Sequence, residues 1–178
     1  MNESSNPIRP SMSPRAARLC AKAALVAACA FGTAHATPPS GIITAPVVAR
    51  GYFADATDVK FKITGRGQDV ILAPNAGDTV VQRILFGPNS NFGWHSHPGP
   101  VVVVVVSGEL TFYDGDDPTC TPRTYYPGQV FVDKGQGHVH FARNLSMTNN
   151  LELYATYFDV PAGKSPRIDA PDPGNCSF

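Results

Sequence analysis

Short apolar segments, each ended by glycine, proline, asparagine or aspartate, follow one another along most of this 178-residue chain. Glycine and proline occur 16 and 17 times, and both favour tight turns because they suit the backbone angles that turns require. No segment repeats its apolar residues at the 3.6-residue period of an amphipathic helix. The pattern predicts an all-β sandwich or barrel in a single domain. We expect strands near 47–54, 58–64, 69–73, 79–86, 92–96, 101–106, 109–113, 129–132, 138–142 and 150–159.

Two segments constrain this arrangement further. Gly87-Pro88-Asn89 is expected to separate two strands, because it combines three turn-forming residues. Val101 to Val106 is a run of six valines, and a continuous apolar strand predicts that both of its faces are covered. Two interpretations of the valine strand remain open: a central strand within one monomer, or an interface in a homodimer.

Residues 1–36 have the features of an export signal. Arg15, Arg18 and Lys22 precede a short apolar run, Ala23 to Phe31, and Ala34-His35-Ala36 is a small-residue cleavage pattern. The apolar run is too short to span a bilayer. We therefore expect cleavage after Ala36, a mature chain without a transmembrane span, and a periplasmic or secreted location.

Two alternatives to this interpretation remain. Val26-Ala27-Ala28-Cys29 resembles a bacterial lipobox, which would make Cys29 a lipidated anchor. The apolar run could also belong to a buried amphipathic helix. The proposed mature part comprises a barrel domain at 37–160 and a Pro-rich tail at 161–178, which we expect to be irregular surface structure.

The charge balance and the cysteines of the mature part agree with export. The whole chain has 14 basic and 14 acidic residues, but removing the leader leaves a net charge of about −3, so we expect no nucleic-acid partner. Cys120 and Cys176 then form an even pair, which in an oxidising compartment predicts a disulfide. Two free thiols are the alternative.

Four of the five histidines form two pairs with the same spacing. His95 and His97 are two residues apart, as are His138 and His140, while His35 lies in the predicted leader. Residues two apart on a strand point to the same face, and imidazole is the commonest protein ligand of transition metals. The pairs predict a metal site inside a small barrel.

The region from Gly87 to Asn144 resembles the cupin superfamily. Two motifs carry the resemblance: a His-x-His pair between glycines, and a second histidine followed by an asparagine four residues later. Gly135 stands where the second motif usually has proline. The matching positions are Gly87, His95, His97 and Gly108 in the first motif, and Gly128, Gly137, His140 and Asn144 in the second.

The resemblance implies a double-stranded β-helix, or jelly-roll barrel, that binds a metal in its mouth. By position it implies the ligands His95, His97 and His140, while the glutamate that is the family's fourth ligand falls at Val101. His138 is a candidate for a residue at the mouth or for the fourth ligand. Gln82 and Tyr154 are weaker candidates, drawn only from strand parity.

Three neutral imidazoles leave the charge of a divalent ion uncompensated, which favours an anionic, chelating substrate. We therefore expect one divalent transition metal (Fe, Mn, Zn, Ni or Cu) and a small-molecule ligand or substrate. Oxygen-dependent oxidation or isomerisation of a small chelating anion is the first hypothesis. A non-catalytic module that binds a metal or small ligand is the second, and a structural barrel that has lost its metal is the third.

Overall fold

The computed structural model of the protein describes residues 36–65 and 69–178. The predicted export signal, including the lipobox alternative at Cys29, lies outside these ranges except for Ala36. The described residues contain no helix, and so none long and apolar enough to cross a membrane. The strands are β1 (Ser40–Thr44), β2 (Val47–Gly51), β3 (Val59–Ile63), β4 (Asp69–Ala73), β5 (Asp78–Ser96), β6 (Val101–Ser107), β7 (Leu110–Asp114), β8 (Arg123–Tyr125), β9 (Val130–Asp133), β10 (His140–Asn144), β11 (Leu151–Val160) and β12 (Ile168–Asp169).

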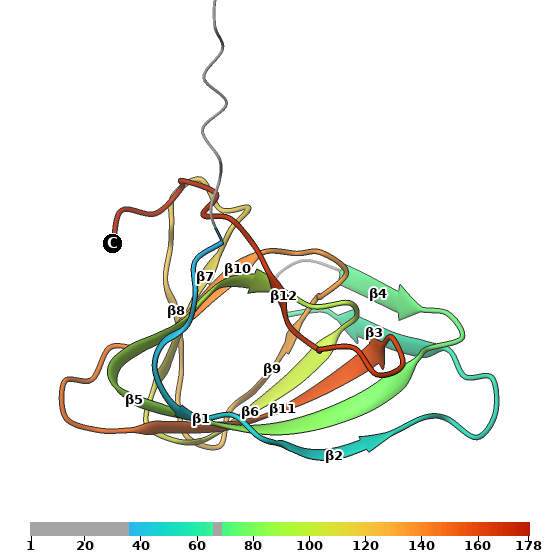
Figure 1. Ribbon diagram of the computed structural model, residues 1–178. Coiled ribbons are helices and arrows are strands. Elements are labelled where there is room, and N and C mark those ends of the chain that lie inside the picture. The colour runs from blue at the N-terminus through green and yellow to red at the C-terminus, as the bar shows by residue number, and fades with distance from the viewer. Residues whose placement is uncertain (1–35, 66–68) are drawn as a thin grey trace, which may run out of the picture. The chain divides into compact units, whose positions relative to one another are not determined.

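Strand β5 organises the fold, because each half of it pairs with a different part of the chain (Figure 1). Its first half pairs with β11, from which the sheet continues through β6 to β9; its second half pairs with β10, followed by β7 and β8. Every pairing is antiparallel. The sheet therefore curves about β5 into a nearly closed barrel. β3 and β4 form a separate two-stranded sheet, while β1, β2 and β12 also pair with β5.

The expected break at Gly87-Pro88-Asn89 is wrong, since β5 runs through it without interruption. Asn89 has a φ of 45°, so the backbone changes direction there without leaving the sheet. Gly87 lies against β1, and a Cβ at this position would be only 2.9 Å from the carbonyl oxygen of Gly41. The turn-forming residues thus produce a bend in one long strand. β1, β8 and β12, short strands in polar or Pro-rich sequence, were not among the expected strands.

The valine strand β6 lies between β11 and β9. Val101, Val103 and Val105 point into the barrel and are buried, whereas Val102 and Val104 are half-buried and Val106 is 46% exposed. The expectation that both faces are fully covered therefore holds only for the inner face. The inner residues join a single apolar core with members from β5, β6, β7, β10 and β11.

Residues 161–178 return to the barrel after β11. β12 pairs with the end of β5, and Cys176 forms a disulfide with Cys120, with a Cα–Cα separation of 5.3 Å. The predicted disulfide is thus confirmed. Phe178 packs against Trp94 in a second, outer aromatic cluster. The tail is largely irregular, as expected, but it is fastened at several points.

Candidate metal centre

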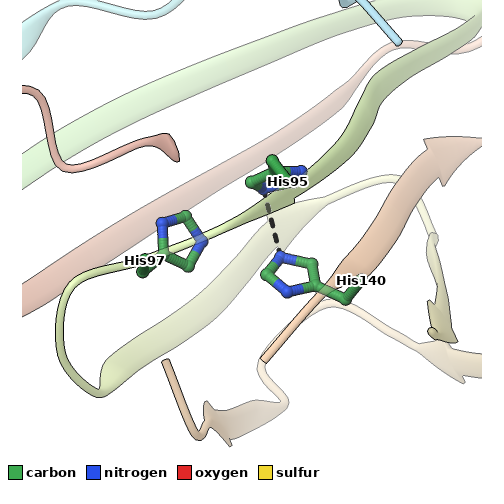
Figure 2. Close-up of side chains that lie close together, drawn as sticks. All are labelled: His95, His97 and His140. Atoms are coloured by element: carbon green, nitrogen blue, oxygen red, sulfur yellow. Dashed lines mark hydrogen bonds between the residues drawn. The ribbon is translucent and has the colours of Figure 1, made fainter. Parts of the chain in front are cut away.

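Three of the predicted ligands meet inside the barrel. His95 and His97 lie near the end of β5, and His140 begins β10, directly opposite His95 in the pairing of the two strands. The three side chains point toward one another (Figure 2), with 3.1 Å between Nε2 of His95 and Nε2 of His140. Each residue is at most 4% exposed, and one ring nitrogen from each lies within 4.8 Å of the others.

Backbone carbonyls set the orientation of two of these rings. Nδ1 of His95 lies 2.8 Å from the carbonyl oxygen of Gly93, and Nδ1 of His97 lies 2.7 Å from that of Pro166. A carbonyl oxygen only accepts hydrogen bonds, so Nδ1 must be the protonated nitrogen in both rings. Each Nε2 is consequently unprotonated and can offer its lone pair to a metal ion, in exchange for the hydrogen bond that Nε2 of His95 accepts from Nε2 of His140.

The environment keeps the three imidazoles neutral. Burial, followed by the proximity of His140, lowers the pKa of His97 to about 4. The same two effects lower the pKa of His95 well below its ordinary value, and burial lowers that of His140. Because a metal binds the neutral form of histidine, the ligand set does not have to lose protons at neutral pH.

His138 lies beside the three-histidine cluster, but not on the strand that was expected to begin at residue 138. It lies in the turn before β10, so the assumption that it alternates with His140 along one strand is wrong. The left-handed backbone of Gln136 and Gly137, with φ of 53° and 85°, delays the start of the strand. Nδ1 of His138 lies 3.2 Å from Oδ1 of Asp133, and its Nε2 lies 2.9 Å from Oδ1 of Asp114.

These two carboxylates determine the protonation of His138. Burial alone lowers the pKa of His138, but the hydrogen bond to Asp133 and the negative charge of Asp114 outweigh it and raise the pKa above its ordinary value. His138 thus differs from the three clustered histidines, whose pKa values are lowered. The sequence pointed to this residue but not to the two aspartates that hold it.

Asp133 is the most important residue that the sequence did not reveal. It ends β9 and is 4% exposed, with its Oδ2 3.5 Å from Nδ1 of His140 and 3.7 Å from Nε2 of His97. Burial raises the pKa of Asp133, but the surrounding imidazoles, His140 and His138 foremost, lower it below its ordinary range. The sequence contained one indication of this residue: an aspartate directly after three apolar residues, Val130 to Val132, in an expected strand.

The other two candidates for a fourth ligand do not supply one. Tyr154 is on the outer face of β11, 36% exposed, because the inward positions of this strand are those of Leu153, Ala155 and Tyr157. The amide of Gln82 donates to the carbonyl of Ala45 and accepts a hydrogen bond from the hydroxyl of Tyr157. Tyr157, and not Tyr154, lies near the cluster: its ring packs edge-on against His97, with 4.9 Å between the ring centroids.

The histidines line one part of a cavity of about 40 Å³. Apolar side chains make up most of its wall, among them Phe92, Phe112 and Val101. Phe92 therefore contributes to the cavity, whereas Trp94 packs outside it against Phe141. A space of this size holds about two or three water molecules.

The donor set fits a divalent metal ion. Three neutral nitrogens face one another within 4.8 Å, and two buried atoms beside them, Nδ1 of His140 and Oδ2 of Asp133, have no hydrogen-bond partner among the described residues. A cation at the cluster would favour the hydrogen bond between these two atoms, since it would fix Nε2 of His140 as the ligand nitrogen.

No protein-family model and no curated protein matches the chain. Among solved structures, it is similar to an uncharacterised protein with a double-stranded β-helix domain from Klebsiella pneumoniae, with 22% identity, 52% of this chain and 74% of that chain covered, and a TM-score of 0.41. It is also similar to a cupin-like protein from Thermotoga maritima (21% identity, 53% and 65% covered, TM-score 0.43). A third is a polyketide cyclase from Streptomyces resistomycificus (16% identity, 53% and 64% covered, TM-score 0.42). The solved structures that this chain resembles thus include cupin and double-stranded β-helix proteins, and its described part is a nearly closed antiparallel β-barrel.

Proposed function

We propose that this protein is an exported small cupin that binds one divalent transition metal through His95, His97 and His140. The observation that most supports this is the convergence of three buried imidazoles, two of which are held by carbonyls with Nε2 unprotonated. The Cys120–Cys176 disulfide is compatible with export, because disulfides persist in oxidising compartments.

The proposed reaction is dioxygenase or isomerase chemistry on a small chelating anion. A bound divalent ion would supply the Lewis acidity that polarises such an anion. The protein's part is to orient His95 and His97 through the carbonyls of Gly93 and Pro166 and to exclude water with the apolar wall of the cavity. A low-dielectric wall strengthens the electrostatic attraction between ion and anion.

A second candidate is a non-catalytic periplasmic module that binds a metal or a small ligand. The size of the cavity favours this alternative, because about 40 Å³ admits only a few non-hydrogen atoms unless the barrel opens. Oxygen uptake together with product analysis of the metal-loaded protein, with a panel of small hydroxy and oxo carboxylates, distinguishes the two. Turnover that is lost in His95→Ala identifies an enzyme, whereas binding without turnover for any metal identifies a module.

Metal content tests the proposal that both candidates share. The mature chain, purified without a polyhistidine tag and reconstituted with iron, manganese, nickel, copper or zinc, should hold about one equivalent of at least one of them. His95→Ala and His140→Ala should lose it. Tyr154→Phe, on the outer face, is the matched control and should keep it. Less than about a tenth of an equivalent in the wild type for every metal would reject the proposal.

A further inference from the structure

The pairing of β6 with β9 places a carboxylate beside the position where the cupin pattern expects one. Val101, at the site of the family's glutamate, is the Cα partner of Asp133 across the two antiparallel strands. Directly opposed residues of an antiparallel pair present their side chains on the same face. Both residues line the cavity that contains the histidines.

The two oxygens of Asp133 have different surroundings. Oδ1 is engaged by Nδ1 of His138 at 3.2 Å and by the backbone N–H of Gly135 at 3.4 Å. Oδ2 is buried, has no hydrogen-bond partner in the described part of the chain, and lies 3.5 Å from Nδ1 of His140. The contacts of Oδ1 fix the carboxylate, and they leave Oδ2 directed at the histidine cluster.

The mutual distances indicate that Asp133 acts through His140. His95, His97 and His140 each have a possible ligand atom within 4.8 Å of the other two. Asp133 belongs to a different group of this kind, with His138 and His140. A carboxylate that accepts the Nδ1–H of a ligand histidine fixes the tautomer and ring orientation, and it makes the other nitrogen a better donor. His95 and His97 already have carbonyl acceptors for this purpose. Among the described residues, Nδ1 of His140 makes no hydrogen bond of normal geometry, and the backbone of His138 contributes only an interaction that raises the pKa of His140.

We propose that Asp133 replaces the missing glutamate of position 101 as the carboxylate of the metal centre, positioning His140 through its Nδ1 and supplying the negative charge. This inference rests on the proposed metal binding. It also accounts for Oδ2 of Asp133, which is buried with no hydrogen-bond partner among the described residues, an arrangement that is costly unless a cation or a donor compensates it. Val101 can then serve as an apolar wall of the cavity.

Metal affinity of Asp133→Asn tests the inference, because the amide keeps the shape and removes the charge. In competition with a chromophoric zinc chelator, this variant should bind zinc about 10- to 100-fold more weakly than the wild type. Asp116→Asn is the matched control: its carboxylate is 84% exposed and lies 4.0 Å from Nε2 of His138, and its zinc affinity should be unchanged. Equal affinity for wild type and Asp133→Asn, or equal weakening of both variants, would overturn the inference. A wild type that binds no metal would instead reject the proposed function.

A measurement on the wild type covers the case in which Asp133→Asn does not fold. In the zinc-loaded protein, nitrogen-15 spectra of the imidazoles should show Nδ1 of His140 protonated and Nε2 unprotonated. The Nδ1 proton should exchange slowly with solvent, because its acceptor is buried. An unprotonated Nδ1 on His140 would contradict the proposed hydrogen bond to Asp133.

Discussion

Replacing both Cys120 and Cys176 by serine should lower the free energy of unfolding by about 4 kcal/mol. The two cysteines are 56 residues apart in sequence. In the chain-entropy relation, a closed loop of that length removes about 14 cal/mol/K from the unfolded ensemble, which corresponds to about 4 kcal/mol at 25 °C. This loss is a large fraction of the stability of an ordinary domain, which is about 5–15 kcal/mol.

Urea unfolding followed by tryptophan fluorescence measures this loss, because Trp94 is the single tryptophan of the chain and is 1% exposed. Reductant provides the control: it should bring the wild type down to the stability of the double variant and leave the variant itself unchanged. A double variant that loses less than about 1 kcal/mol would refute the entropy argument.

Three further predictions concern stability. Between pH 6.5 and 4 the metal-free protein should lose up to about 3 kcal/mol through His97, because burial and a neighbouring imidazole lower its folded-state pKa to about 4 while the unfolded chain takes up the proton near pH 6.5. In urea titrations across this range, the free energy of unfolding should depend less on pH in His97→Gln than in the wild type. The same pH dependence in both proteins would contradict the assignment to His97. Gly163→Ala should cost about 1 kcal/mol for its φ of 70°, whereas Gly135→Ala should cost well beyond that, because its Cβ would clash with the carbonyl oxygen of Gly99. Similar unfolding midpoints for the two variants would show that this clash is unimportant. Leu151→Ala, at a fully buried core position, should cost about 2–5 kcal/mol, and a smaller loss in the same titration would indicate that the cavity collapses.

The histidine spacing anticipated most of the site because it depends on local geometry. His95 lies near the end of β5 and His97 directly follows it, and their ring centroids lie 5.0 Å apart, as the two-residue period predicts. Their meeting with His140 requires β10 to pair with β5, and here the cupin-like motifs supplied what periodicity could not. The same resemblance led to the barrel, which composition and turn residues had narrowed only to a sandwich or barrel.

Asp133 and His138 show where this reasoning stops. The distance from Asp133 to His140 depends on which strands pair and in which register, and a single strand pattern does not contain that information. The strand expected from residue 138 begins only at His140, because two left-handed residues precede His138. Gly135, which departs from the usual proline, has a φ of 60°, and proline is restricted to about −65°. Glycine in place of the family's proline at position 135 therefore reflects the left-handed backbone of this turn.

The bond between His97 and the carbonyl of Pro166 connects the cluster to the last part of the chain. Synthesis proceeds from the N-terminus, so all three histidines emerge before the segment that orients one of them. A protein truncated before Pro166 would keep the whole ligand set, yet the ring of His97 would lack its acceptor. If the proposed metal binding holds, the C-terminal segment is therefore part of the centre, although it contributes no ligand.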